Sequence, residues 1–280
     1  MSGFINVLKP PGMTSHDAVA FIRKVYGLKR VGHAGTLDPA AAGVLPVAVG
    51  QATRLIEYLS DAGRKSYRVE MTFGYQTDTG DDTGKIIARA KGPPPSPLAV
   101  EKTLTLFQGE IAQVPPMYSA IKLNGQKLYE LARAGISFER APRAITIYRI
   151  DLRQIKENKV LFDVECSKGT YIRSLCFDIG ESLHYPAVMS FLVRTKVGPF
   201  GLENTVCLEE IAREPEKSLQ PPDLAVPFLP ACKLSAQQSL EFRQGRSVTG
   251  PAVNGTLYRL YDDHDVFCGI GRAVSPLLIK

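Results

Sequence analysis

Alternating apolar and polar residues predict two strands in the middle of the chain. One apolar face consists of Tyr67, Val69, Met71, Phe73 and Tyr75, and their neighbours are mostly polar. A period of two is typical of a strand with one buried face. The same alternation at Phe162, Val164 and Cys166 predicts a second strand. The polar run 77–84 and the short apolar run 85–90 predict a turn and a returning strand, and therefore a hairpin.

Apolar residues at three- and four-residue spacing predict several helices. One such set follows the second strand and consists of Ile172, Leu175, Cys176, Ile179 and Leu183. Ser167 and Thr170 precede this set and are candidate caps, and a helix that begins near Thr170 has Arg173 in its first turn. Similar patterns cover residues 15–26, 99–108 and 126–134. Because helices and strands are interleaved, we expect a mixed α and β domain.

A proline-rich segment divides the chain into two predicted domains. The 280 residues suffice for about two domains. Residues 214–230 contain five prolines and predict a linker between a main domain at 1–213 and a module at 231–280. The module contains short strand-like runs at 256–261 and 266–270, which predict a small β-module that leans on the main domain.

Composition indicates a soluble enzyme with a basic surface. Hydrophobic residues make up 44% of the chain and charged residues 22%, and the longest uncharged stretch is too short to span a bilayer. The start of the chain lacks the pattern of a secretory signal, so we expect a cytoplasmic protein. Five scattered cysteines without a C-x-x-C pair argue against disulfides and a zinc site. The net charge of +6 is compatible with a polyanionic partner such as RNA.

One stretch of small and apolar residues contains a single carboxylate. Within residues 31–50 the ionisable side chains are His33 and Asp38. Gly32, Gly35 and Gly43 permit tight turns or the close approach of a ligand, and Pro39 restricts the conformation of Asp38. Asp38 is therefore a candidate catalytic group. Two ordinary alternatives stay open, because Asp-Pro also begins helices and His33 can be a hydrogen-bonded turn histidine.

Several short motifs follow one another along residues 3–200. They are Lys9-Pro-Pro-Gly-Met-Thr-Ser15, Gly32-His-Ala-Gly-Thr-Leu-Asp-Pro39, Lys65-Ser-Tyr67, Pro115-Pro-Met-Tyr-Ser-Ala120, Cys166-Ser-Lys-Gly-Thr-Tyr-Ile-Arg173 and Leu192-Val-Arg-Thr195. In this order they resemble the TruB family of tRNA pseudouridine synthases, and the last fifty residues resemble a PUA-type RNA-binding module. The resemblance implies an α+β fold, with a mixed, largely antiparallel sheet flanked by helices and a small C-terminal β-module.

The same resemblance implies that the protein isomerises a uridine in the T-loop of tRNA, at position 55. The bond between ribose C1′ and uracil N1 is broken, the base rotates, and C1′ is joined to C5. This chemistry needs no metal and no other cofactor. By resemblance Asp38 is the nucleophile, and attack at uracil C6, attack at ribose C1′ and a glycal route all stay open. The implied partner is the tRNA T-arm, bound by a monomer.

The resemblance assigns Arg173 and Tyr67 to catalysis beside Asp38. A nucleophilic carboxylate must be ionised and held in place, and Arg173 is the implied cation. A cation in the first turn of a helix is disfavoured by the helix dipole unless a carboxylate faces it, which supports the same pairing. Tyr67 would stack on the uracil and take part in removing the C5 proton. Without the resemblance, Arg173 would be interpreted as a surface arginine and Tyr67 as a core residue.

Four further residues would surround the substrate. By resemblance Tyr171 and Leu192 line the base pocket, and Lys9 supports the active-site loop. His33 would lie beside the flipped nucleotide, where an imidazole can fill the gap that the extruded base leaves. Taken alone, Tyr171 and Leu192 would be interpreted as core residues, and His33 as a turn histidine.

A basic segment is a candidate RNA-binding surface. Residues 121–143 carry three basic charges in excess of acidic ones, and we select Lys122, Lys127 and Arg133 as RNA contacts. A solvated helix face is the alternative. The acidic residues at 78–82 do not fit an EF-hand, because Thr83 stands where glycine is needed, so we expect a solvated turn rather than a metal site.

Two other functions remain open. One is a guide-dependent pseudouridine synthase of the dyskerin type, against which stand the absent basic terminal extensions and the uninterrupted 119–125 region. The other is a non-catalytic protein that binds or folds RNA. Loss of the candidate nucleophile would indicate such a protein, but Asp38 is present.

Overall fold

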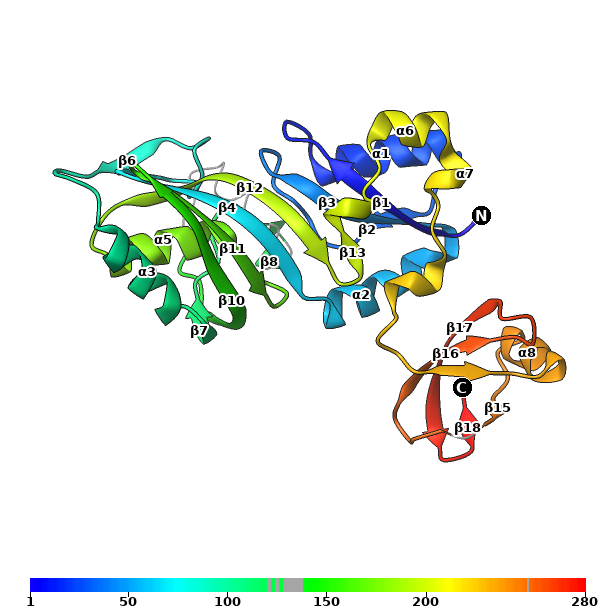
Figure 1. Cartoon of the computed structure of the whole chain (residues 1–280). Helices are drawn as coiled ribbons and strands as arrows, with labels where there is room; N and C mark the ends of the chain where they lie inside the picture. The colour runs from blue at the N-terminus through cyan, green and yellow to red at the C-terminus, as the bar shows by residue number, and fades with distance from the viewer. Residues whose placement is uncertain (120–121, 124–125, 128–137, 251) are drawn as a thin grey trace.

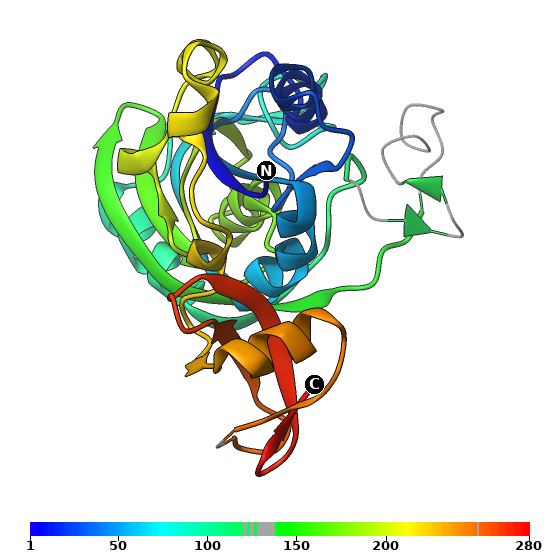
Figure 2. The same cartoon turned by 90° about the vertical axis from the view of Figure 1, so that its right-hand side faces the viewer.

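The computed structural model describes residues 1–119, 122–123, 126–127, 138–250 and 252–280. A large sheet with helices beside it forms the main body, and the C-terminal strands form a smaller body next to it (Figures 1 and 2). In the described residues, no helix is long and apolar enough to cross a membrane.

Nine strands of the described chain form the main sheet. Their order is β1 (Gly3–Lys9), β3 (Ala42–Val49), β12 (Ala187–Val197), β4 (Lys65–Phe73), β11 (Lys159–Cys166), β10 (Arg143–Lys156) and β7 (Gly109–Gln113), with β2 (Val31–His33) on β3 and β13 (Phe200–Gly201) on β12. All of these pairs are antiparallel except β3 with β12. The mixed, largely antiparallel sheet that the resemblance implied is therefore confirmed.

The two strands predicted from alternation are β4 and β11, and they are neighbours in the sheet. Their apolar residues are buried in one core cluster, where Tyr67 is paired with Val164 and Val69 with Phe162. The hairpin exists, but it pairs β5 (Tyr75–Thr77) with β6 (Ile86–Arg89) as a separate two-stranded sheet. Gly74, with a φ of +114°, separates β4 from β5.

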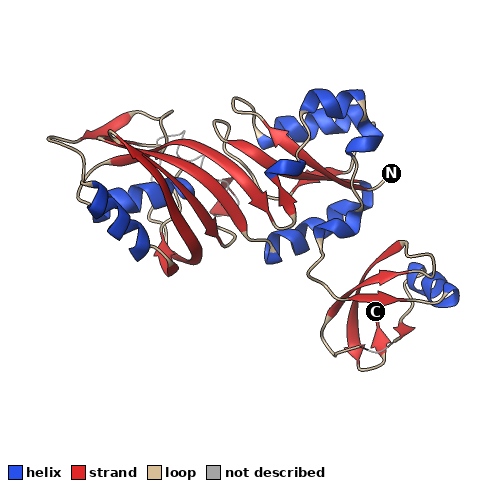
Figure 3. Ribbon diagram, in the orientation of Figure 1, coloured by secondary structure: helices blue, strands red, loops and turns tan. Residues whose placement is uncertain are grey.

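The helices lie beside different parts of the sheet (Figure 3). Beside β10, β4 and β12 lie α3 (Pro97–Leu106) and α5 (Ile172–Ser182), while α1 (Ser15–Tyr26) and α6 (Leu208–Arg213) lie beside β1 and β2. The 3₁₀ helices η1 (Gly50–Leu55) and η2 (Leu202–Asn204) and the helix α2 (Ile56–Ala62) connect these parts. The predicted α1 is confirmed, and α3 begins two residues early because Ser96 caps it and Pro97 is favourable at its first position.

Two details of the helix predictions need correction. The helix α5 begins at Ile172 with Tyr171 as N-cap, so the predicted caps are wrong: the Ser167 hydroxyl accepts the Thr146 N–H instead. The helix predicted at 126–134 is wrong at its start, where β9 (Gln126–Lys127) pairs with β8 (Lys122–Leu123). Residues 128–134 lie outside the described residues.

The proline-rich segment is bound to the main sheet. It contains α7 (Pro215–Ser218) and η3 (Pro222–Ala225), and Gln220 exchanges backbone hydrogen bonds of 2.7 and 3.0 Å with Phe4 of β1. Val226 is completely buried against the same cluster as Phe4. The exact domain boundary stays a prediction, but this segment is an attached connection rather than a free linker.

The last fifty residues form the predicted β-module. Five strands are ordered β14 (Ala231–Lys233), β16 (Leu257–Tyr261), β17 (Phe267–Ser275), β18 (Leu278–Ile279) and β15 (Val248–Thr249), and α8 (Ala236–Arg243) packs beside them. The module has its own small cluster around Leu234, Tyr258 and Leu260. Phe267 and Ile270 pack on the main body, as expected for a module of this size.

The junction between β3 and β12 requires a glycine. Only two residue pairs join these strands, Ala42 with Val193 and Gly43 with Arg194. Gly43 has a φ of +111°, and a Cβ atom there would overlap the carbonyl oxygen and the amide nitrogen of Arg194. Any other residue at this position would push the two backbones apart.

Gly43→Ala should therefore destabilise the protein by about 3 kcal/mol or more, because it adds a backbone clash to the cost of a positive φ. Gly74→Ala is the matched control, since Gly74 has nearly the same φ and open space around its missing Cβ. The control should cost only about 1–2 kcal/mol. Urea unfolding of both variants measures the difference, and equal losses would show that the junction tolerates a side chain.

Candidate active site

Asp38 lies in the loop that connects β2 to β3. The hydroxyl of Ser15, at the start of α1, accepts the Leu37 N–H at 2.9 Å and donates to the Leu37 carbonyl at 3.1 Å. The Gly12 N–H donates to the Pro39 carbonyl at 2.9 Å. Asp38 is thus fixed on both sides, and Asp38-Pro39 forms a turn rather than the helix start that remained open from the sequence.

Arg173 holds the Asp38 carboxylate at two points. Its Nε donates to Oδ2 at 2.9 Å and its Nη2 to Oδ1 at 3.2 Å. The remaining N–H groups donate to the carbonyls of Thr79 at 2.9 Å and Tyr118 at 2.8 Å. The Arg173 side chain is 5% exposed and that of Asp38 is 35% exposed. The pair thus combines a buried, immobilised cation with a carboxylate that solvent or a ligand can reach.

Arg173 stands in the first turn of α5, where the helix dipole disfavours a cation. Asp38 compensates for this, and a second carboxylate lies nearby, since Asp81 Oδ2 is 4.0 Å from Arg173 Nε. Asp81 is 9% exposed and accepts hydrogen bonds from Thr79 and Thr83. The expectation of a solvated turn is therefore wrong for Asp81, and nothing in the local sequence distinguishes it from its acidic neighbours.

Tyr67 and Leu192 face the same side of the sheet. They lie on the adjacent strands β4 and β12, are 7% and 6% exposed, and belong to one cluster with Leu37 and Ala41 from the Asp38 loop. Burial raises the pKa of Tyr67 to about 12, and the nearby Arg194 partly opposes this shift. Tyr67 is consequently a neutral phenol at physiological pH, able to stack and to donate a hydrogen bond.

Lys9 is completely buried and hydrogen-bonds to the backbone of the Asp38 loop. Its ammonium donates to the carbonyls of Pro10 at 2.8 Å, Met13 at 2.7 Å and Pro39 at 3.3 Å. Burial lowers the pKa of Lys9 to about 8, and the charge of Asp38 partly offsets this effect. This geometry fits the predicted support of the active-site loop, because one side chain connects the segment after β1 to the residue after Asp38.

Tyr171 and His33 complete the predicted set. Tyr171 is half-buried, and its backbone N–H and C=O both bond to the Gln113 side chain, at 2.8 and 3.1 Å. His33 ends β2 and meets the ring of His16 edge-on, at 5.6 Å between centroids. Burial, and then the charge of His16, lower the pKa of His33 to about 4. The imidazole of His33 is therefore neutral near pH 7.

The predicted RNA-contacting residues are only partly within the described residues. Lys122 lies in β8 and Lys127 in β9, which pair as a two-stranded antiparallel sheet. Arg133 lies outside the described residues. The role of all three in binding RNA stays a prediction.

Comparison with known proteins assigns the family. Residues 23–172 match the TruB family pseudouridylate synthase N-terminal domain, and residues 173–224 and 230–278 match two TruB C-terminal domains. A tRNA pseudouridine synthase B of Caldanaerobacter subterraneus is 47% identical over 98% of this chain and 95% of its own length. Another, of Alkaliphilus oremlandii, is 54% identical over 75% of this chain and 70% of its own. The chain belongs to the TruB family.

As a TruB family member the protein is a pseudouridine synthase, which is an isomerase. A solved Cbf5-Nop10-Gar1 complex also contains a similar chain, which superposes with a TM-score of 0.76 and is 30% identical in sequence. The match covers 99% of the present protein and 83% of the chain in that complex. The fold and enzyme class implied by the motifs are thus confirmed. The roles of the individual residues stay predictions.

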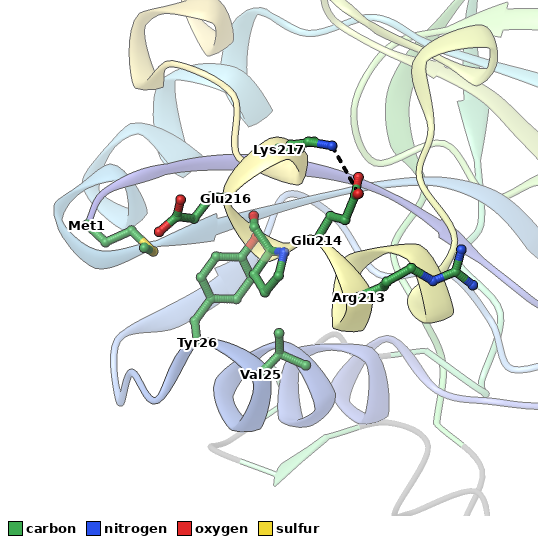
Figure 4. A pocket seen from close by; sticks show the side chains of 8 residues that line it. Met1, Val25, Tyr26, Arg213, Glu214, Glu216 and Lys217 are labelled. Atoms are coloured by element: carbon green, nitrogen blue, oxygen red, sulfur yellow. Dashed lines mark hydrogen bonds and ion pairs between the residues drawn. The ribbon is translucent and has the colours of Figure 1, made fainter.

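A cavity of about 490 Å³ lies elsewhere in this TruB family protein, between the end of α1 and α7 (Figure 4). Two pairs of its polar groups bond to each other: the Tyr26 hydroxyl donates to the Pro215 carbonyl, and Lys217 pairs with Glu214 at 2.9 Å. None of its lining residues belongs to the set around Asp38. Within the described residues, no group of three or more metal-ligating side chains is arranged around a common point.

The lowered pKa of His33 predicts an acid sensitivity of folding. Between pH 6.5 and about 4 the unfolded chain binds a proton that the folded His33 does not, so folding stability falls as the pH decreases. The wild type should lose about 2 kcal/mol more than His33→Gln between pH 7 and pH 5. Urea unfolding at both pH values measures this. His264→Gln, at an exposed histidine, is the control, and identical losses in all three proteins would contradict the prediction.

Proposed function

We propose that this protein converts a uridine in the T-loop of tRNA to pseudouridine, with Asp38 as the nucleophile. The observation that carries the proposal is the two-point ion pair of Asp38 with the buried Arg173, which leaves the carboxylate open to a ligand. In the reaction the C1′–N1 bond breaks, the base rotates, and a C1′–C5 bond forms. C5 loses its proton to a base or to solvent, and N1 gains one proton. Atoms and electrons balance without an oxidant or reductant.

Each side chain has a distinct part in this proposal. Asp38 attacks the flipped nucleotide, at C6 or C1′, or assists a glycal route, and in every case it must be anionic when the base arrives. Arg173 keeps it so and fixes its direction. Tyr67 stacks on the uracil, and its neutral hydroxyl donates a hydrogen bond or passes on the C5 proton.

The base pocket is proposed to have Tyr67, Tyr171 and Leu192 as its walls. His33 would fill the gap that the flipped nucleotide leaves, because its neutral ring can stack without attracting a counterion. Lys122, Lys127 and Arg133 would bind phosphates of the T-arm. We propose that the protein acts on tRNA as a cytoplasmic monomer.

The alternative is a reaction that needs a guide RNA. Two relatives named tRNA pseudouridine synthase B are 47% and 54% identical to this chain, compared with 30% for the similar chain of the Cbf5-Nop10-Gar1 complex, and this difference supports the reaction on tRNA alone. Incubation of the purified protein with transcribed tRNA alone, followed by mapping of pseudouridine, decides between them. We expect modification of the T-loop uridine. Unmodified tRNA would reject the proposed function, and modification elsewhere would reject the T-loop assignment.

Asp38→Asn should abolish product formation while tRNA affinity stays within about twofold, since the amide keeps the shape of the side chain but is not a nucleophilic anion. Single-turnover assays and filter binding measure the two quantities. Asp61→Asn, at an exposed residue paired with Lys168, is the control and should react like the wild type. Turnover by Asp38→Asn that persists after deamidation is excluded would remove Asp38 from its proposed role.

Arg173→Lys should lower the single-turnover rate by about 100-fold or more although the charge is kept. An ammonium cannot make two contacts to Asp38 and also bond to the carbonyls of Thr79 and Tyr118. Arg149→Lys is the matched control, because that arginine pairs with Asp151 on the exposed side of the sheet. Equal rates for wild type and Arg173→Lys would mean that the fixed geometry of the pair is unimportant.

A further inference from the structure

Arg194 is a completely buried cation, and no carboxylate in the described part of the chain is paired with it. Its side chain donates to three backbone carbonyls, those of Val44 at 2.8 Å, Gly35 at 3.0 Å and Thr36 at 3.4 Å. Among the described residues, no carboxylate oxygen lies within 4.0 Å of it. Removing a guanidinium from water costs several kcal/mol when no anion compensates. Here the dipoles of the three carbonyls, together with the neighbouring Tyr67 hydroxyl, offset that cost.

The three carbonyls belong to the two ends of one loop. Gly35 and Thr36 precede Asp38, and Val44 follows it, at the start of β3. A single guanidinium therefore connects the segment that leads into the turn with the segment that leads out of it. Lys9 acts on the same loop through Pro39, so the loop is held at its ends by one cation and near its tip by another.

The backbone of Arg194 lies where three strands meet. In β12 it is paired with Gly43 of β3 on one side and with Tyr67 of β4 on the other. Residues directly opposite in an antiparallel pair project to the same face of a sheet, so the guanidinium lies beside the phenol of Tyr67. Arg194 thus contacts both parts of the candidate site, the Asp38 loop and Tyr67.

The charges around Arg194 show that it does not serve as an ordinary ion-pair partner. The groups whose pKa its charge shifts include Lys9, His33, Lys65 and Tyr67, from β1, β2 and β4. The charge of Asp38 also acts on Lys9 and Tyr67, but its carboxylate is bound to Arg173 instead. Lys65 Nζ and Arg194 Nη1 both approach Gly35. Only the planar guanidinium, with five N–H groups, can satisfy three carbonyls that converge from different directions.

We propose that Arg194 is a positioning residue of the isomerisation. Its guanidinium bonds to both ends of the Asp38 loop and lies beside the Tyr67 ring, and it thereby aligns the carboxylate and the phenol with the base. This inference rests on the proposed function of Asp38. It predicts that the shape of the loop, rather than RNA binding, depends on the guanidinium.

The test is Arg194→Lys in single turnover on tRNA. Loss of the three-carbonyl contact should lower the rate about 100-fold at pH 7, while the dissociation constant for tRNA stays within about twofold. A buried ammonium without a carboxylate loses its proton as the pH rises, whereas arginine stays charged. The ratio of the variant rate to the wild-type rate should therefore fall further between pH 7 and pH 9.

Arg194→Gln supplies the neutral counterpart. Its rate should be low as well, but the ratio to the wild-type rate should not change with pH, because glutamine does not titrate. Arg68→Lys is the matched control for arginine replacement, since Arg68 lies on β4 with a half-exposed side chain paired to Asp163, and its rate should be unchanged. Rates are expressed per folded molecule, from tRNA-binding stoichiometry and thermal melting.

Two results would overturn the inference. One is a wild-type rate for Arg194→Lys across the pH range, and the other is a loss of rate in both variants that disappears once the folded fraction is taken into account. An inactive wild type would instead reject the proposed function. The two failures are thus distinguishable in the same set of assays.

Discussion

The short parallel pairing of β3 with β12 is the contact on which the arrangement of the site depends. It joins the part of the sheet formed by β1, β2 and β3 to the part formed by β4, β11, β10 and β7. The Asp38 loop enters β3 on one side of this junction, and Leu192 and Arg194 lie on β12 at the other. Tyr67 is one strand further on. Residues that are far apart in the sequence therefore converge because two backbones approach closely at Gly43.

Two buried arginines fix the position of Asp38 through different contacts. Arg173 contacts the carboxylate itself and supplies the opposite charge, whereas Arg194 contacts only backbone carbonyls of the loop and the neighbourhood of Tyr67. No carboxylate oxygen of the described residues lies within 4.0 Å of Arg194, and Lys9 and Lys65 add positive charge nearby. Under the proposed function, this positive charge would favour any negative charge that develops on the uracil.

The sequence predicts the parts of the fold whose burial alternates in a regular way. The strands β4 and β11 and the helix α1 follow from apolar spacing, because each has one buried and one exposed face. The strand β3 is apolar along nearly its whole length, so its pattern shows neither its period nor its partner. The family motifs point to Asp38 and Arg173. The burial of Asp81 and Arg194 depends on partners about 90 to 160 residues away, which no local pattern reveals.

The partial exposure of the Asp38 carboxylate is consistent with the nucleophilic role proposed for it. A carboxylate buried as deeply as Arg173 would be well held but would have no path to the substrate, and one free in solvent would be reachable but badly directed. Arg173 resolves this conflict because the carbonyls of Thr79 and Tyr118 fix its guanidinium independently of Asp38. The position of the cation therefore does not depend on the carboxylate alone. Under the proposed function, a base that displaces water from the open side of Asp38 would strengthen the attraction between the two charges, because the local dielectric constant falls, and would so hold the carboxylate more firmly against Arg173.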